Sequence, residues 1–499
     1  MGILDTFIPM DRREALANGV QLFDRTNGSA LFADISGFTH FSQELFNELG
    51  SQLGAEILTQ QLNKVYGALI DVIHRYHGSV ISFAGDAITC WFDGDNGRLA
   101  TAAALEMQKV MIQLEHLSTP SGSMYPLGIK VAVTSGNARR FVVGIPSIQN
   151  IEVLAGEILD RMAAVEKQLK SGEVVVGSEV MGRLGNQAII KEWRQDESGE
   201  HFAVLTGLTE PIQENPWTQT PDLDPELARG WLLPPVYQRL IRGEGDFLAE
   251  LRPGVAIFVK FQGIDYDGDD LAGEKLNTFI SWLQALLSRY EGMLHELIIG
   301  DKGSYVFSTI GARVAHEDDV DRALSASIEM TSPPPEVDFI HGIQIGITRG
   351  QMRVGTYGAA NRRIYGAHGN TVNIAARFME HAEPGQILTS DRIRKEAASQ
   401  FKFTSLGTIT FKGFDEPFQT YQLTGSIEEK PVDLLSSDYP IVGREREKEI
   451  IDSSLQTLIT GDSTHIAISG DAGIGKSRLV EYAYQQAQQS GVRTMLGLG

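Results

Sequence analysis

The 499-residue sequence contains a single cysteine, a deficit of positive charge and no long apolar run. One thiol, Cys90, cannot form a disulfide framework, which fits a reducing compartment. No apolar stretch reaches the roughly 18 residues that a membrane-spanning helix needs, and no charged-then-apolar signal segment opens the sequence. We therefore expect a cytoplasmic protein without a membrane span.

The shortage of positively charged residues also limits the kinds of partner that the protein can bind. Lysine and arginine number 43 against 64 acidic residues, so the formal charge is −21. Such a field repels nucleic acid, so no nucleic-acid partner is expected. A phosphate ligand must instead be held by local cations, backbone amides or a metal ion. Apolar residues make up 42% of the chain, which is long enough for three ordinary domains.

The sequence repeats itself once. The first copy contains LFADISGFTHFS at 31–42 and VISFAGDAITCWF at 80–92, and the second contains AIFVKFQGID at 256–265 and LIIGDKGSYVF at 297–307. Asp34 of the first copy aligns with Lys260 of the second. Paired acids, Asp34 and Asp86, are therefore expected in one half only, which suggests a single composite site completed by the other half.

Apolar spacing predicts the same order of elements in both copies. In the first copy it predicts a strand at 30–35, helices at 54–76, 101–117 and 154–171, and further strands at 80–92, 127–134, 173–176 and 202–205. The order βαββαβ is typical of an α+β, ferredoxin-like fold. A proline-rich stretch with one predicted helix at 235–242 separates the copies. The predicted domains are 1–210, a linker at 211–247, 248–425 and 426–499.

The last segment carries GDAGIGKS at 470–477, which fits a P-loop when a strand precedes it and a helix follows. A strand is predicted at 464–468, so we expect the start of an α/β P-loop domain. Gly470 and Gly475 would shape the loop, Lys476 would reach the β/γ-phosphates and Ser477 a magnesium ion.

Asp34 ends a predicted strand and Asp86 lies in a predicted hairpin turn, so both carboxylates are expected at one sheet edge. Such oxygen ligands suit magnesium, and the carbonyl of Ile35 is a candidate third ligand. Gly37 allows close approach of a phosphate, and the amides of Phe38 and Thr39 at the following helix start are candidate anion donors. The alternative is that Asp34 caps a helix and Asp86 is only a turn residue.

In the second copy, Asn373 and Arg377 lie four residues apart and share one helix face. An amide and a guanidinium are suited to orient a sugar oxygen and neutralise a phosphate. Their first-copy counterparts are Asp160 and Ala164, the mirror of the Asp34–Lys260 asymmetry. The alternative is an ordinary solvated helix face.

The runs FADISGF, FAGDA and GNTVNIAAR resemble the class III nucleotidyl cyclases. The tandem copies followed by a P-loop resemble the soluble, bicarbonate-responsive adenylyl cyclases. The resemblance implies a pseudo-twofold intramolecular dimer with one active site between two cyclase homology domains. It implies two Mg²⁺ or Mn²⁺ ions on Asp34 and Asp86, ATP as substrate, Asn373 at the ribose and Arg377 at the transition state. It also implies phosphate contacts from Lys302 and Lys412.

Some positions depart from the family pattern. The base-reading positions hold Gly366 and Leu297, so ATP and GTP are not separated by side chains, and the glutamate of guanylyl enzymes is not expected there. A small-molecule or ion regulator is expected at the degenerate second site. Ser82 and Ala163 replace the bicarbonate-binding lysine and arginine, which argues against bicarbonate unless Arg161 substitutes. The alternatives to an adenylyl cyclase are a guanylyl cyclase or a catalytically silent nucleotide-sensing module.

Overall fold

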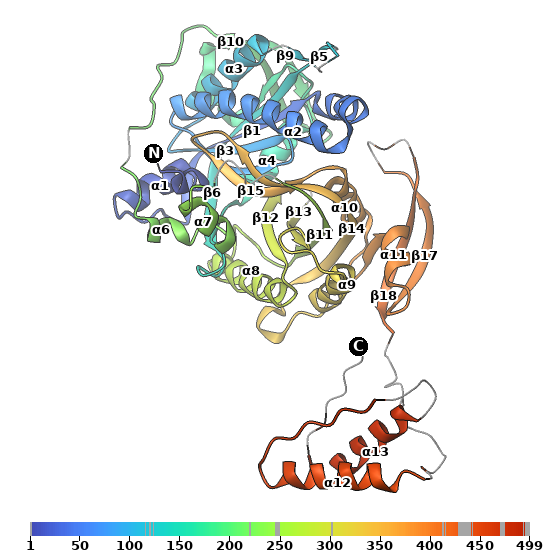
Figure 1. Cartoon of the computed structure of the whole chain (residues 1–499). Coiled ribbons are helices and arrows are strands. Elements are labelled where there is room, and N and C mark those ends of the chain that lie inside the picture. Colours follow the sequence, from blue (N-terminus) through green and yellow to red (C-terminus); the bar gives the residue numbers. More distant parts are fainter. Residues whose placement is uncertain are drawn as a thin grey trace. The chain divides into compact units, whose positions relative to one another are not determined.

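The computed structural model divides into two compact units, Met1–Ser426 and Ile427–Gly499, which are described separately (Figure 1). It describes residues 2–114, 116–118, 121–122, 124–218, 221–244, 250–300, 303–411, 414, 416–427, 441, 443–469, 475–492 and 494. The side chains at 38–40, 42–43, 46–47, 51–52, 55, 116–118 and 477 are outside this description.

The first half of the first unit is built on one sheet with strand order β2-β3-β1-β6-β8-β10-β9, and β7 pairs with β6. Its long helices α2 and α3 lie on one face of the sheet (Figure 1). The elements are β1 (Arg25–Ser36), α2 (Phe38–Arg75), β2 (Ser79–Ala84), β3 (Ala87–Asp93), α3 (Arg98–Gln113), β4 (His116–Ser118), β5 (Met124–Pro126), β6 (Gly128–Val143), β7 (Ile151–Ala155), α4 (Glu157–Glu166), β8 (Val174–Val176), α5 (Ser178–Leu184), β9 (Ala188–Gln195) and β10 (His201–Leu208).

The second half repeats this topology, with the order β12-β13-β11-β14-β16-β18-β17 and β15 paired with β14. Its elements are β11 (Glu250–Gln262), α8 (Ala272–Arg289), β12 (Met293–Gly300), β13 (Gly303–Ile310), α9 (Asp319–Met330), β14 (His341–Gly358), β15 (Arg363–His368), α10 (Asn370–His381), β16 (Ile387–Ser390), α11 (Asp391–Ala397), β17 (Phe401–Ile409) and β18 (Phe418–Ser426). The predicted α+β fold with two ferredoxin-like halves is confirmed.

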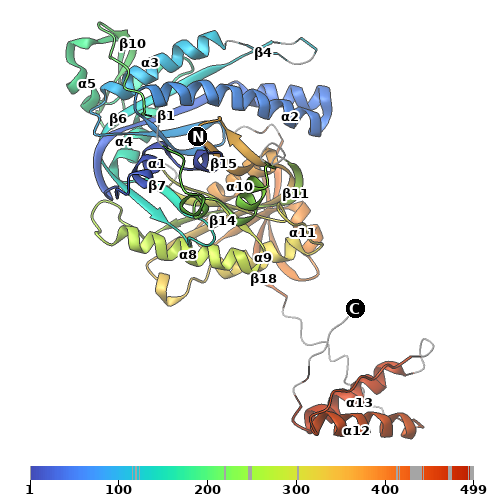
Figure 2. The same cartoon turned by 60° about the vertical axis from the view of Figure 1, so that its left-hand side comes forward.

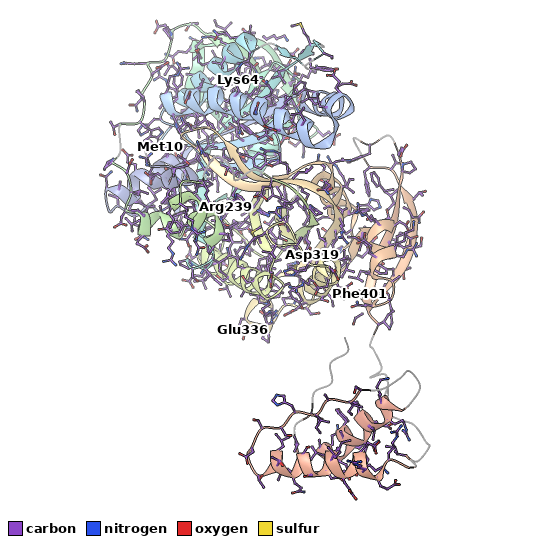
Figure 3. The ribbon with its side chains drawn as sticks, viewed as in Figure 1. Met10, Lys64, Arg239, Asp319, Glu336 and Phe401 are labelled. Carbon is purple, nitrogen blue, oxygen red and sulfur yellow. The ribbon has the colours of Figure 1, made fainter. Side chains whose placement is uncertain are left out.

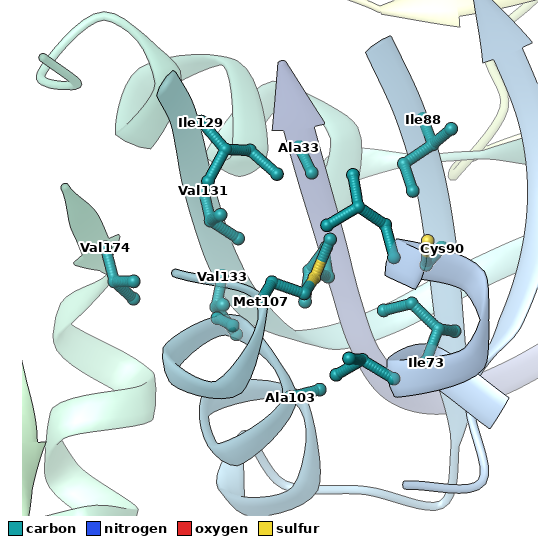
Figure 4. Packing of buried hydrophobic residues seen from close by; sticks show 14 of the residues in the cluster. Ala33, Ile73, Ile88, Cys90, Ala103, Met107, Ile129, Val131, Val133 and Val174 are labelled. Atoms are coloured by element: carbon teal, nitrogen blue, oxygen red, sulfur yellow. The ribbon is translucent and has the colours of Figure 1, made fainter. Parts of the chain in front are cut away.

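The core of the first half lies between its sheet and the helices α2 and α3. Figure 4 shows Ala33 and Ile88 on neighbouring strands packed against Met107 of α3 and Ile73 of α2. Cys90 is buried among them, and burial raises the pKa of its thiol. The thiol is therefore a neutral packing group at physiological pH.

Two arms cross between the halves and bury apolar side chains in the opposite core. We define the first arm as residues 139–155, where β6 pairs with β7, and the second arm as residues 353–368, where β14 pairs with β15. Phe141 and Val153 of the first arm belong to the core of the second half. Figure 2 shows the strands of this arm beside α8. Ala359 of the second arm belongs to the core of the first half. The exchange ties the two sheets into one unit.

The two arms are held by matching hydrogen bonds. The amide of Gly144 donates to Asn277 Oδ1 of α8 at 2.8 Å, and the amide of Gly358 donates to Asn63 Oδ1 of α2 at 3.1 Å. Equivalent asparagines on equivalent helices thus receive the opposite arm, which is the relation a pseudo-twofold axis produces.

The N-terminal segment and the linker contribute short helices. Met10, labelled in Figure 3, begins α1 (Met10–Ala17), which follows η1 (Leu4–Phe7). The linker holds α6 (Pro225–Arg229), which the sequence did not predict, and α7 (Pro234–Ile241), close to the predicted helix at 235–242. A one-turn helix η2 (Gly185–Gln187) precedes β9, and η4 (Pro335–Val337) precedes β14.

One predicted helix was wrong at its start. The helix expected at 154–171 is the end of strand β7 followed by the shorter α4. Gly156 separates them with φ of 98°, a conformation that favours glycine. The apolar residues before Gly156 fit the spacing of a helix and that of a strand equally well. Their pairing with β6 makes this segment a strand.

The second unit contains α12 (Glu445–Ile459) and α13 (Lys476–Gln489). The strand predicted at 464–468 is absent from the described part of this unit, where no partner strand is present to complete its hydrogen bonds. None of the described helices combines the length and apolar character that a bilayer crossing requires.

Candidate active site

The backbone brings Asp34 and Asp86 to the same edge of the first sheet. Asp34 pairs in register with Ala87 of β3, the residue that follows Asp86. The amide of Ile35 donates to the carbonyl of Asp86 at 3.3 Å, which closes the two segments on each other. The expected convergence of the two acids is therefore present in the backbone.

The negative charges of Asp34 and Asp86 are only partly compensated by nearby positive charge. Burial, and then the negative charge of Asp34, raise the pKa of Asp86 to about 6. Lys130 of β6 lies opposite Asp34 in register, and its Nζ is 2.5 Å from Asp34 Oδ2. The sequence analysis missed Lys130, although its position on the strand next to β1 could have identified it.

These residues fit a divalent cation. The surroundings of Asp86 disfavour its charged form and so raise its pKa. A bound cation would stabilise the charged carboxylate. No cluster of three or more acidic, histidine or cysteine ligands is present among the described residues. Two carboxylates, with remaining positions left to carbonyl, phosphate or water oxygens, are the pattern that Mg²⁺ prefers.

The start of α2 lies directly after Asp34 and Ile35. Gly37 precedes the helix with φ of 104°, and a Cβ at this position would lie 2.5 Å from the carbonyl oxygen of Pro126. Only glycine fits here, and α2 begins at Phe38 with free amides at its N-terminus. The side chains of Phe38 and Thr39 lie outside the described residues.

A cavity of about 510 Å³ lies between the two halves. It is lined by Asp86 of the first half and by Asn373 and Arg377 on α10 of the second. Arg377 forms an ion pair with Glu380, one turn further along α10, and both line the cavity. Asp34 and Gly37 are not among its described lining residues. Lys302 and Lys412 lie outside the part of the chain that the structure describes.

Tyr66 of α2 holds the turn that carries Asp86. Its hydroxyl donates to the carbonyl of Gly85 at 2.7 Å, and its ring packs edge-on against Phe83. Burial, followed by the nearby acidic groups, raises the pKa of Tyr66, so it stays a neutral donor. Apolar spacing alone does not identify Tyr66 as a support of this turn.

Glu296 is a cavity residue that the sequence analysis missed. It lines the large cavity and a smaller one of about 80 Å³ next to it. Burial raises the pKa of Glu296 to about 8. A Cβ at Gly366 would lie 3.8 Å from Glu296 Oε1, so the two proposed base-reading strands face each other here.

Strand register corrects the assignment of Leu297 to this position. Ser82 pairs with Thr89 after an irregularity in β2, and Glu296 pairs with Phe307 after an irregularity in β12. Thr89 and Phe307 pair in turn with Phe32 and Phe258, which are equivalent in the repeat. Glu296 is therefore the counterpart of Ser82. The hairpin after β12 is longer than the one after β2, and for this reason counting back from the turn misplaced it.

The same cavity continues past the second-copy hairpin toward α4. Ser82, Ala163 and Glu166 line this part, where the degenerate second site is expected from the sequence. Arg161 is not among its described lining residues and forms an ion pair with Glu157. Nothing in this geometry makes Arg161 a substitute for the missing bicarbonate ligands.

Comparisons with known proteins show which sequences and folds this chain is similar to. Residues 268–425 match the family model described as "Adenylate and Guanylate cyclase catalytic domain". "Adenylate cyclase type 10" of Oryctolagus cuniculus is 23% identical over 95% of this chain, and the Homo sapiens protein of that name is 23% identical over 93%. The chain is thus similar to nucleotidyl cyclases, and the family match lies in its second half. It spans 31% of the length of these two relatives.

The chain also resembles a solved structure described as a "Class III adenylyl cyclase-like ATP-binding protein from Pseudomonas aeruginosa". The likeness covers 74% of this chain and 85% of that one, with a TM-score of 0.52 and 12% identity. Such a likeness supports the fold of the paired halves.

The P-loop motif is only partly described. Gly475 precedes α13, which begins at Lys476 as the motif predicts. Gly470 and the side chain of Ser477 lie outside the described residues. The role of this segment stays a prediction.

Proposed function

We propose that the cyclase homologue converts ATP to 3′,5′-cyclic AMP and pyrophosphate at one composite site. The observation that carries this proposal is the shared cavity, to which the first half contributes Asp86 and the second contributes Asn373 and Arg377. The oxygen ligands for cations and the nitrogen donors for a nucleotide thus come from opposite halves of the protein, which meet at this cavity.

In this proposal Asp34 and Asp86, with the carbonyl of Ile35, hold two Mg²⁺ or Mn²⁺ ions. Such ions supply positive charge that acidifies a hydroxyl and stabilises phosphate oxygens. Gly37 and the first amides of α2, including those of Phe38 and Thr39, bind phosphate oxygens at the helix N-terminus.

The second half supplies the groups that act on the nucleotide. Asn373 orients the ribose so that its 3′-oxygen lies in line with the α-phosphorus. Arg377 stabilises the charge that develops on the α-phosphoryl oxygens as the 3′-oxygen attacks and pyrophosphate leaves. Glu380 holds the Arg377 guanidinium before substrate binds. Lys302 and Lys412 are proposed to offset the charge of the departing pyrophosphate.

Glu296 separates the first candidate function from a second, a guanylyl cyclase, through its protonation state. An ionised carboxylate accepts hydrogen bonds from the N1–H and N2–H groups of guanine, whereas a carboxylic acid can donate to N1 of adenine and accept from its N6 amine. The raised pKa of Glu296 makes the acid form available at neutral pH, which supports ATP. Ionisation on substrate binding would instead favour GTP and a guanylyl cyclase.

The test is the turnover of ATP and GTP side by side by the purified chain with Mg²⁺ or Mn²⁺. We expect cyclic AMP and pyrophosphate in equal amounts, and loss of at least about 100-fold in Asp86→Ala. Asp338→Ala, an exposed aspartate outside the cavity, is the matched control. Near-normal turnover by Asp86→Ala would rule out this site.

A further inference from the structure

Arg362 projects from the second arm into the first half. Its side chain is almost completely buried, with 3% of the residue exposed. Nε donates to the carbonyl of Val80 at 2.9 Å and Nη2 to that of Ile81 at 3.1 Å. Nη1 donates to the carbonyl of Phe7 at 3.1 Å. One guanidinium of the second half therefore ties together two backbone segments of the first.

These partners are unusual for a buried arginine, because the side-chain hydrogen bonds of Arg362 within the described residues all go to backbone carbonyls. A planar fork of five donors can serve four carbonyls at once, here those of Phe7, Val80, Ile81 and Arg363, which the point charge of lysine cannot do. Burial lowers the pKa of Arg362 to about 10, so it remains charged at physiological pH. The bonds are charge-assisted, and the side chain that makes them is almost completely buried.

The two carbonyls lie at the irregularity of β2. The register of β2 against β3 shifts between Val80 and Ser82, so Ile81 does not pair regularly with β3. Such bulges redirect a strand and interrupt its hydrogen bonds. Three residues after Ser82, β2 reaches the Gly85–Asp86 turn. The guanidinium thus fixes the strand that leads to the cavity-lining acid.

The turn is held from two directions. Tyr66, a residue of the first half, binds the carbonyl of Gly85, and Arg362 of the second half binds the base of the same strand. The second arm is itself fixed on α2, where Asn63 accepts from Gly358 and Asp71 accepts from Asn361. A displacement of the arm would therefore change the support of the Asp86 turn.

We propose that Arg362 is a positioning residue that makes cation binding by the first half depend on the packing of the second arm. The inference rests on the proposed function, in which Asp86 is a cation ligand. It assigns to the second half a role in building the acidic pair, in addition to supplying Asn373 and Arg377.

The test compares Arg362→Lys with Arg363→Lys. Arg363 is the next residue and the matched control, because its Nε bonds only to Ala359 within its own turn. The readout is the dissociation constant of Mn²⁺, measured by electron paramagnetic resonance with a non-cyclisable ATP analogue present. Removal of groups that orient metal ligands typically weakens metal binding by about 10–100-fold. We expect at least about tenfold weaker Mn²⁺ binding for Arg362→Lys and no change for Arg363→Lys.

A second variant covers the case in which Arg362→Lys does not fold. Asn63→Ala removes the acceptor of the arm without leaving a buried charge, and we expect it to weaken Mn²⁺ binding in the same direction. In Arg362→Lys, kcat should fall more than KM for ATP changes. Unchanged Mn²⁺ binding in Asn63→Ala, or in a folded Arg362→Lys, would overturn the inference. Failure of the wild-type chain itself to bind Mn²⁺ would overturn the proposed function as well, so the two failures are distinguishable.

Discussion

The replacement of Glu296 by Gln gives a prediction whose size follows from the structure. No hydrogen bond or ion pair to the Glu296 carboxyl is found among the described residues, and burial alone raises its pKa from 4.5 to about 8. The folded protein therefore favours the protonated form. This contribution to stability is fully present below pH 4.5 and is lost as the pH rises through 8.

The magnitude has an upper limit set by linkage. A shift of about 3.5 pH units corresponds to about 5 kcal/mol at about 1.4 kcal/mol per unit. Water that enters the cavity solvates the carboxylate and reduces this value, so we expect about 2–4 kcal/mol between pH 5 and pH 9. Glu296→Gln removes the ionisable proton while keeping one acceptor and adding donors.

The assay is urea unfolding of wild type, Glu296→Gln and the exposed control Glu197→Gln at several pH values from 5 to 9. The wild type should lose stability relative to Glu296→Gln as the pH rises, whereas Glu197→Gln should follow the wild type. If the free energy of unfolding changed equally with pH in wild type and in Glu296→Gln from pH 5 to 9, the reasoning would be refuted. The ratio of ATP to GTP turnover should also fall in the wild type as pH rises through 8, and stay constant in Glu296→Gln.

Three further predictions concern the cation site, the arms and the transition state. Lys130→Met removes the positive charge beside Asp34, so Mn²⁺ should bind about fivefold tighter. The measurement is a titration followed by electron paramagnetic resonance, and weaker binding would contradict the assigned ion pair. Phe141→Ala should destabilise the protein by about 3–5 kcal/mol in urea, because its ring fills the core of the opposite half. The exposed Phe23→Ala serves as its control, and equal losses would show that the arm is not anchored as described. Arg377→Lys keeps the charge but loses the planar fork, so kcat should fall about 10²–10³-fold with little change in KM, and unchanged kcat would exclude its role.

The sequence predicted the parts of the site that are set by local rules. The Gly85–Asp86 turn follows from its glycine between two apolar runs, and the duplicated sheet follows from the repeat. Alignment of the two copies with each other was enough to show that Asp34 of the first copy is replaced by Lys260 in the second. These features depend on neighbours close in sequence or on direct comparison of the copies.

What the sequence did not predict depends on partners far away in the chain. Phe141 and Ala359 pack into a core made by the other half, so no local period identifies their strands. Glu296 was missed because the two hairpins differ in length, which only strand pairing reveals. Arg362 carries no local signal, because the carbonyls that it binds in the first half are more than 280 residues away.

The claim of a single composite site is tested most directly by comparing mirrored variants. The measurement is the initial rate of cyclic AMP formation by Asp34→Ala and Asn373→Ala, set against the equivalent positions of the opposite halves, Lys260→Ala and Asp160→Ala. The account predicts that the first two lose at least about 100-fold in rate while the last two keep rates within a few-fold of wild type. Equal losses in both pairs, or an active Asp34→Ala, would contradict it.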